Sequence, residues 1–125
     1  MQMKVSLGVV QISKSTKKKM SKRLRDVRKA KKDVRGFDET YYSAGEKDDI
    51  ERELDEYETY LMNRRKGLTN REIEVVMGMD RGYYKGENWQ GTRNYGILMS
   101  IQLTNDSIWK LKKIKKKLYG NTRLM

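Results

Sequence analysis

The chain has 125 residues, of which 37% are charged and 36% apolar, and its formal net charge is +12. A chain of this length is expected to form one domain with a thin core, and its positive field attracts polyanions such as DNA, RNA or an anionic membrane surface. Cysteine and histidine are both absent. Their absence excludes disulfides, thiolate and typical zinc sites, and Ser-His or Cys-His catalysis.

The charge is arranged in four blocks along the chain. The net charges are +11 for residues 1–36, −8 for residues 37–60, +3 for residues 61–95 and +6 for residues 96–125. Blocks of this kind indicate binding segments more directly than the net charge does. We expect a basic N-terminal arm over residues 1–45 and a domain with a basic C-terminal helix over residues 46–125.

The arm is expected to hold a short strand followed by a helix. Apolar and polar residues alternate over residues 3–9, which favours a half-buried strand or, alternatively, a flexible start. Residues 14–35 are otherwise cationic but have a narrow apolar stripe close to helical spacing, formed by Met20, Leu24, Val27 and Val34. We expect this helix to contact nucleic-acid phosphates; the alternative is a solvated helix that packs by one edge. The candidate phosphate contacts are Lys18, Lys22, Arg25 and Lys29.

A second helix is predicted over residues 47–65. Four apolar side chains share one face of it, at Ile50, Leu54, Tyr57 and Leu61. Gly67 is a suitable C-terminal stop. The acidic residues of this helix are expected on the surface, where they can dock the basic arm, and a catalytic pair of carboxylates among them is disfavoured.

The middle of the chain contains the most informative pattern. Thr69 and Glu72 have the spacing of a capping box. A short helix should therefore run from Asn70 to about Met77. Gly78 offers the positive φ angle that a tight turn requires, and a second short helix is expected after it. One small core should join Ile73, Met77, Met79 and Tyr84.

This helix, glycine turn and second helix resemble the helix-turn-helix of the lambda-repressor-like family of small phage and bacterial DNA-binding regulators. The resemblance covers about residues 47–118. It implies a mainly α fold, a helix-turn-helix bundle of four to five helices preceded by the basic arm with its short strand and helix. The helices that it implies are residues 48–66, residues 70–77, a recognition helix over residues 80–88, residues 94–103 and residues 105–118.

The same resemblance assigns roles to residues of the motif. It implies phosphate contacts at Asn70 and Arg71, backbone-side positions at Thr92 and Arg93, and major-groove contacts at Arg81, Tyr83 and Lys85. Two features depart from the family: Glu74 stands in place of a small residue, and Gly82 and Gly86 each weaken the recognition helix by about 1 kcal/mol relative to alanine. A helix-turn-helix that contacts RNA or protein, or a purely structural helical hairpin, is the alternative.

The last predicted helix is apolar on one side and strongly basic on the other. Its apolar side is formed by Ile108, Leu111, Ile114 and Leu118. We expect this stripe in the core, although it can also pair with a second copy, since the resembled family often binds DNA as a homodimer. The lysines, among them the candidate phosphate contacts Lys112 and Lys116, can bind phosphates or solvate the helix. A membrane surface is disfavoured because such binding needs more apolar content.

Aromatic residues gather around the expected recognition helix. Tyr84 and Trp89 are expected in the core, whereas Tyr83 is expected to be exposed. Exposed aromatic side chains among basic ones can stack on unpaired bases of a nucleic acid.

The sequence thus predicts a small DNA-binding regulator from a phage or mobile element, with duplex DNA as its partner. One alternative is a structural RNA-binding protein of a ribonucleoprotein particle, because both ends of the chain are basic. Another is an inhibitor that binds a nucleic-acid enzyme through the acidic residues 38–58. No catalytic or phosphate-cradling motif has the required spacing, so we expect no enzyme, cofactor, metal site or membrane partner. Since the sequence contains no transmembrane stretch or signal peptide, we expect a cytoplasmic protein.

Overall fold

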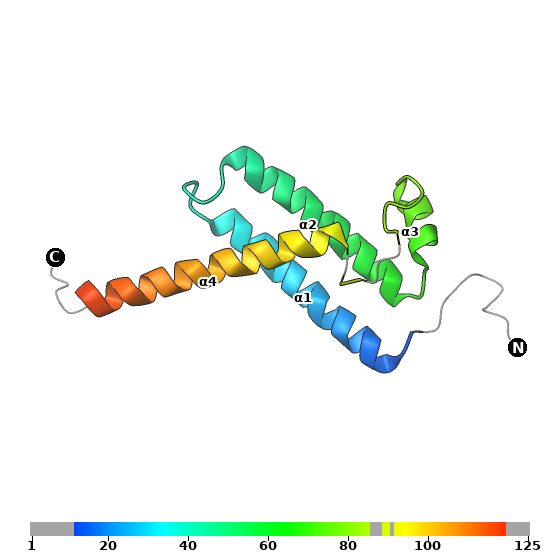
Figure 1. Ribbon diagram of the computed structural model, residues 1–125, viewed down its shortest axis with the longest axis horizontal. Coiled ribbons are helices and arrows are strands. Elements are labelled where there is room, and N and C mark those ends of the chain that lie inside the picture. The colour runs from blue at the N-terminus through cyan, green and yellow to red at the C-terminus, as the bar shows by residue number, and fades with distance from the viewer. Residues whose placement is uncertain (1–11, 86–88, 91, 120–125) are drawn as a thin grey trace, which may run out of the picture.

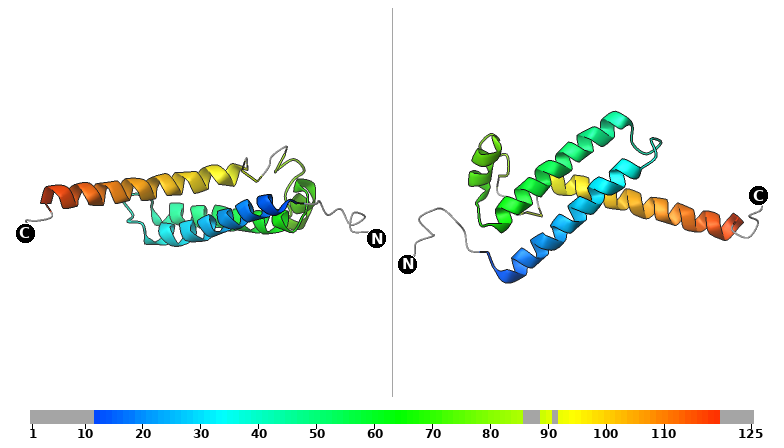
Figure 2. Two further views of the ribbon diagram at one scale, coloured as in Figure 1. Left: turned by 90° about the horizontal axis from the view of Figure 1, so that it is seen from below. Right: turned by 180° about the vertical axis from the view of Figure 1, so that it is seen from behind.

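Two layers of helices make up the described part of the chain, residues 12–85, 89–90 and 92–119 of the computed structural model (Figure 1). In chain order the helices are α1 (Lys14–Gly36), α2 (Ala44–Arg65), α3 (Asn70–Met77) and α4 (Arg93–Tyr119). Helices α1 and α2 form an antiparallel hairpin, and α4 crosses one face of it (Figures 1 and 2). The mainly helical fold predicted from the sequence is confirmed, whereas the strand expected over residues 3–9 lies outside the described residues.

Helices α1 and α2 begin at side-chain caps. The Ser13 hydroxyl accepts a hydrogen bond from a backbone N–H of the first turn of α1 (3.1 Å). At the start of α2, the Ser43 hydroxyl accepts from the Glu46 N–H and the Glu46 carboxylate accepts from the Ser43 N–H. These caps satisfy backbone donors that the first turn of a helix leaves free. The helices predicted over residues 14–35 and 47–65 are confirmed, although α2 begins three residues earlier than predicted.

Opposite charges line the contact between α1 and α2. Arg28 Nε lies 2.6 Å from Glu58 Oε2, and Lys31 Nζ lies 2.6 Å from Asp55 Oδ1. These pairs raise the pKa of Lys31, chiefly through Asp55, and lower the pKa of Glu58, chiefly through Arg28. The expectation that acidic residues of the second helix dock the basic first helix is thereby confirmed. Partly exposed ion pairs contribute at most about 1 kcal/mol each, so the apolar contact between the helices must supply most of the stability.

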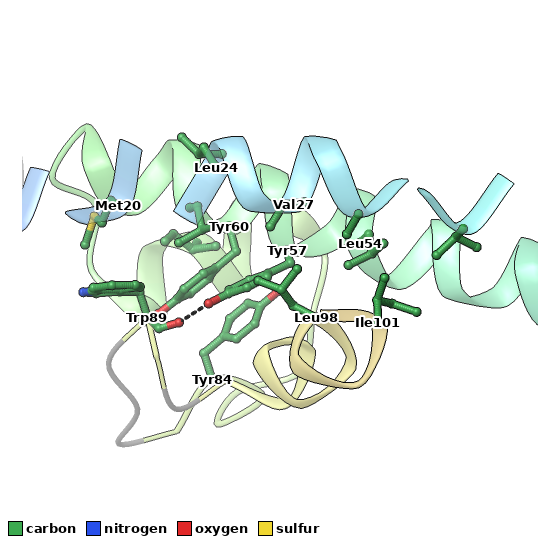
Figure 3. Close-up of a cluster of buried hydrophobic side chains, with 14 of the residues drawn as sticks. Met20, Leu24, Val27, Leu54, Tyr57, Tyr60, Tyr84, Trp89, Leu98 and Ile101 are labelled. Carbon is green, nitrogen blue, oxygen red and sulfur yellow. Dashed lines mark hydrogen bonds between the residues drawn. The ribbon is translucent and has the colours of Figure 1, made fainter. Parts of the chain in front are cut away.

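The core lies where α1, α2 and α4 meet, and Figure 3 shows its central part. The buried apolar side chains of these helices are Met20, Leu24, Val27, Ala30 and Val34 from α1, Leu54, Tyr57, Tyr60 and Leu61 from α2, and Leu98 and Ile101 from α4. The apolar stripe predicted for α1 is therefore confirmed in full. The predicted face of α2 is confirmed at three of its four positions, whereas Ile50 is only partly buried.

Helix α4 is continuous from Arg93 to Tyr119, where two helices were predicted. The predicted break after Leu103 was wrong because no glycine or proline interrupts the backbone hydrogen bonds there. Asn105, which was expected to begin a new helix, instead donates its side-chain amide to Asp33 Oδ2 of α1 (2.5 Å). This bond joins the middle of α4 to α1.

The apolar stripe predicted for the end of α4 does not enter the core. Ile108 is partly buried, but Leu111, Ile114 and Leu118 are exposed. The prediction was wrong because α4 extends beyond the α1–α2 hairpin (Figure 2), so that Leu111 only borders an open hollow beside Phe37 and Tyr41. None of the described helices combines the length and the apolar composition that crossing a bilayer requires.

The substitution Leu54→Ala should lower the free energy of unfolding by about 2–5 kcal/mol, because Leu54 is fully buried in the core and its truncation leaves a cavity. Val75→Ala is the matched control: Val75 is exposed on α3, so its truncation should change this free energy by less than about 0.5 kcal/mol. Urea unfolding followed by circular dichroism measures both variants. Equal losses would show that the core is not where the structure places it.

Candidate nucleic-acid interface

Helix α3 has the two ends that the sequence predicts. The Thr69 hydroxyl accepts from the Glu72 N–H (3.2 Å), and the Glu72 carboxylate accepts from the Thr69 N–H (2.8 Å), which completes the capping box. Gly78 follows the helix in a left-handed conformation with a φ of 71°, which residues with a side chain rarely adopt. The predicted helix Asn70–Met77 and its glycine turn are confirmed.

The recognition helix predicted over residues 80–88 is not formed in its described part. Residues 81–85 make consecutive turns, closed by hydrogen bonds from Tyr83 N to Asp80 O and from Lys85 N to Gly82 O, both 3.0 Å long. Gly82 has a φ of 87°, which is incompatible with an α-helix. Residues 86–88 lie outside the described residues. Within residues 80–85, therefore, no helix is available to enter a major groove.

The buried carboxylate of Glu74 explains why this segment turns. Glu74 is only 2% exposed, and it accepts hydrogen bonds from the Gly82 N–H (3.1 Å) and the Tyr84 N–H (2.8 Å). In an α-helix the Tyr84 N–H would donate to the Asp80 carbonyl, so Glu74 takes a bond that the helix needs. These donors, the Tyr84 N–H first, and an ion pair with Arg71 at 3.2 Å hold the pKa of Glu74 below its usual range.

Two residues that were predicted to lie beside the nucleic-acid backbone, Asn70 and Thr92, are instead directed into the protein. The side-chain amide of Asn70 donates to the backbone of the following turn (2.8 Å), and its Oδ1 accepts from the Tyr60 hydroxyl (2.7 Å). Thr92 is buried immediately before α4. Close to it in the sequence, the Trp89 carbonyl accepts from the buried Tyr57 hydroxyl at 2.5 Å (Figure 3). Burial raises the pKa of Tyr57, which keeps this hydroxyl protonated as a donor.

Tyr83 and Arg93 bond to each other and to α2. The Tyr83 hydroxyl donates to Glu56 Oε2 (3.0 Å) and accepts from Arg93 Nη1 (2.6 Å). The Arg93 guanidinium lies 5.4 Å from the centroid of the Tyr83 ring and pairs with Glu53 at 3.3 Å. Tyr83 was predicted to be exposed, but it is partly buried by these contacts, so that prediction was wrong.

Besides Arg93, whose side chain is 54% exposed, three cations of the motif face solvent. Arg81 and Lys85 are exposed on the turns after α3, and Arg71 is about half exposed despite its pair with Glu74. Because they project from turns and from the start of a short helix, they form a small basic edge rather than the reading face of a helix.

Helix α1 presents its four candidate cations on its outer side. Lys18, Lys22, Arg25 and Lys29 follow one another at intervals of four, three and four residues, which places them on one exposed helical face. Lys22 and Lys29 form ion pairs with aspartates one turn further on, at 3.3 and 2.8 Å. Lys18 and Arg25 take part in no ion pair with another described residue.

The basic sides of α1 and α4 meet at two neighbouring hollows of about 550 and 330 Å³, which we together call the α1–α4 cleft. The two hollows share Asn105, Ile108 and Lys112 of α4 as lining residues. The lysines that line the cleft are Lys29 and Lys32 from α1 and Lys112 and Lys115 from α4. Acidic side chains line it as well, at Asp33, Asp38 and Asp106. Lys116, the other candidate on α4, is exposed one turn beyond Lys112.

Sequence reasoning identified only part of this cleft. It selected Lys29 and Lys112, which the structure brings together, but not Lys32, Lys115 or Trp109. Trp109 lines the smaller hollow and is exposed, with the ammonium of Lys113 4.8 Å from its ring centroid. An aromatic residue directly before a run of lysines was a signal available in the sequence. The proximity of Lys32 to Lys115 was not, because it depends on how α4 crosses α1.

The side chains of the α1–α4 cleft are of the kinds that contact the phosphates and the bases of a nucleic acid. Ammonium groups contact phosphate oxygens, and an exposed indole offers a surface for base stacking. In the residues that the structure describes, no three carboxylates stand close enough together to hold a metal ion.

The substitution Glu74→Gln should lower the melting temperature at neutral pH, because a neutral amide accepts fewer hydrogen bonds and forms no ion pair. The folded-state pKa of Glu74 lies below its ordinary value of 4.5. Its carboxylate therefore stabilises the fold above that value, and the stabilisation is lost as the pH falls through the lowered folded-state pKa. Parent and variant should differ at pH 7 and converge in strongly acidic solution.

Thermal melting followed by circular dichroism across this pH range checks the expectation for Glu74. The matched control is Glu39→Gln, at an exposed position of the loop between α1 and α2, which should melt like the parent throughout. A Glu74→Gln deficit that is independent of pH would contradict the assigned role of the carboxylate.

Comparison with known proteins leaves the family of the chain open. No protein-family model, no curated protein sequence and no solved structure matches it. The resemblance to lambda-repressor-like regulators therefore stays a prediction that rests on the residues of the motif themselves.

Proposed function

We propose that this chain binds nucleic acid through phosphate contacts made by α1 and α4, with duplex DNA as the leading candidate. The observation that carries the proposal is the α1–α4 cleft, where lysines from two helices far apart in the sequence line the same hollows. A nucleic-acid backbone presents phosphates in a row, so cations from both helices can contact it together.

The ion pairs of the fold support the proposal because they leave α1 with charge mainly on one side. On the side that faces α2, Arg28, Lys31 and Arg35 pair with carboxylates. On the outer side, Lys18 and Arg25 have no ion-pair partner among the described residues. A helix that is neutralised towards the core and cationic towards solvent directs a polyanion to its outer face.

Selective reading of bases, as in a small regulator, is a separate part of the proposal. It would depend on Arg81 and Lys85, which project from turns rather than from a helix. Phosphate contacts supply affinity without sequence information, whereas base contacts supply selectivity. We therefore propose a protein that binds duplex DNA mainly through its backbone and with modest target preference.

A structural RNA-binding protein is the alternative that one observation favours. Trp109 is exposed beside Lys113, at the start of the lysine-rich part of α4. Unpaired bases, which folded RNA offers more often than duplex DNA, stack on rings in such surroundings. The inhibitor alternative has less support, since carboxylates of its proposed acidic surface are engaged by α1.

Replacing all four cleft lysines by alanine should weaken binding and reduce its dependence on salt. The four are Lys29, Lys32, Lys112 and Lys115. On duplex DNA each lost phosphate contact lowers the slope of log affinity against log salt by about 0.9, so the slope should fall by up to about 4. Fluorescence anisotropy with a labelled duplex over a salt series measures it.

The control for this experiment removes the same charge from the other side of the hairpin. It replaces Lys47, Arg52, Arg65 and Lys66, on α2 and its C-terminal end, by alanine. The control should keep most of the parent's affinity and slope. Equal losses for the two quadruple variants would mean that net charge, and not the α1–α4 cleft, carries binding.

The double substitution of Arg81 and Lys85 by alanine should remove target preference while non-specific binding persists. Selection of bound sequences from a random duplex pool, with parent and variant side by side, tests this. The parent should enrich a motif that the variant does not; the same motif in both would refute the role of the two side chains. A strong preference of the parent for folded RNA over duplex DNA at equal salt would favour the RNA alternative instead.

A further inference from the structure

Helix α4 has a second exposed face, distinct from its lysines. This line of residues, which we call the α4 stripe, consists of Gly96, Ser100, Leu103, Ser107, Leu111, Ile114 and Leu118. Its leucines and its isoleucine are between 49% and 67% exposed, and its glycine and serines are exposed as well. Helical geometry turns the stripe away from Leu98 and Ile101, which pack in the core. No described segment lies over it, although Leu111 also borders the larger hollow of the α1–α4 cleft.

The spacing of the α4 stripe is the same when read from either end. Its residues follow at intervals of 4, 3, 4, 4, 3 and 4, with Ser107 at the centre. Because this is an 11-residue repeat, the line stays on one side of a nearly straight helix over its whole length. If a second copy of the stripe is laid against the first in the antiparallel direction, each stripe residue therefore lies opposite a stripe residue of the other copy.

We infer that α4 pairs antiparallel with α4 of a second copy of this chain, about a two-fold axis at Ser107. The facing pairs are Leu118 with Gly96, Ile114 with Ser100, and Leu111 with Leu103. Large side chains at one end of the stripe thus meet mainly small residues at the other end, which close packing of two helices requires. The contact would extend over about 33 Å at a rise of 1.5 Å per residue.

The N-terminal half of the stripe is hollowed in the single chain. A hollow of about 460 Å³ is lined by Gly96, Ser100, Leu103 and Ser107 of the stripe and by Tyr41 of the loop between α1 and α2. Apart from its own turns of the helix, a Cβ added at Gly96 would meet no atom of the described residues within 4 Å. Glycine costs a helix about 1 kcal/mol relative to alanine, and the described packing of the chain gives no reason for it at this position. The approach of Leu118 from a second copy supplies one.

Charge favours the antiparallel arrangement over a parallel one. Residues 110–117 contain six lysines and no acid. In a parallel pair these lysine-rich ends would lie side by side. In the antiparallel pair their centres are about 20 Å apart, well beyond the screening length of about 8 Å at physiological salt.

Charge also favours a second copy as the occupant of the stripe. Each lysine-rich end comes to lie along the partner's residues 97–104, to which the loop between α1 and α2 is held by a hydrogen bond between Tyr42 and Thr104 (3.0 Å). That loop and the start of α2, residues 38–49, carry five carboxylates and one lysine. The basic end of one copy therefore approaches the acidic end of the other copy's hairpin.

Sedimentation velocity of the full chain, freed of nucleic acid, tests the pairing directly. The parent should have about twice the monomer mass of 14.8 kDa. Ile114→Lys should have the monomer mass and an unchanged circular dichroism spectrum, because Ile114 is exposed in the single chain. Val75→Lys, the same kind of exchange at an exposed position of α3, should stay dimeric.

Introduced cysteines locate the axis, since the chain has none of its own. Mild oxidation should cross-link Ser107→Cys to its own counterpart, whereas Ser100→Cys should remain uncross-linked because its counterpart lies about 21 Å away. Combining Ser100→Cys with Ile114→Cys should restore the cross-link. Ser100→Cys that cross-links as readily as Ser107→Cys would indicate a parallel pair or random collision and would overturn the inference.

Two further results would overturn it. One is a parent chain that stays monomeric throughout a concentration series. This holds also if the monomer binds phosphatidylserine vesicles through Ile114, because the stripe would then serve a membrane surface and not a second copy. The other is an Ile114→Lys chain that stays dimeric. Because none of these measurements contains nucleic acid, failure of the pairing leaves the proposed nucleic-acid binding untouched, and the reverse also holds.

Discussion

The opposite charges of α1 and α2 are the constraint on which the rest of the structure depends. α1 has twelve basic and two acidic residues, so packing its narrow apolar stripe against a helix of the same sign would be opposed by repulsion. α2 contains eight acidic residues, and three of them pair with Arg28, Lys31 and Arg35 along the contact. Neutralised on this side, α1 can bury its apolar stripe while its outer side stays cationic. The hairpin also forms the surface that α4 crosses.

One buried carboxylate determines the conformation of the central motif and which of its side chains are exposed. Glu74 accepts the N–H groups of Gly82 and Tyr84, and the segment after Gly78 is therefore held as turns. Tyr83 and Arg93 then bond to α2, and Tyr83 is thereby partly buried. As a result, the motif that the sequence made most conspicuous offers only a small basic edge, whereas lysines of two helices line the α1–α4 cleft.

Helix α4 joins the two proposals because its two halves have different surroundings. Its N-terminal half packs on the hairpin through Leu98 and Ile101, while its C-terminal half extends beyond the hairpin (Figure 2). The side that carries Lys112 faces the α1–α4 cleft, and the α4 stripe lies on the adjoining side of the helix, with Leu111 bordering both. Because Lys112 and Lys115 belong to the lysine-rich residues 110–117, phosphate binding and pairing of two copies would both involve this end of α4.

The sequence by itself determined the features that depend on residues a few positions apart. These are the helices α1, α2 and α3, the capping box of Thr69 with Glu72, and the left-handed turn at Gly78. Tertiary structure alone decided the rest. Glu74 meets Tyr84 ten residues away, Asn105 bonds to Asp33 across the core, and Lys115 comes to the same hollow as Lys32. Caps and turns are set by bonds within one turn of the chain, whereas the partners of Glu74, the course of α4 and the exposure of its last turns depend on which surfaces the folded hairpin leaves available.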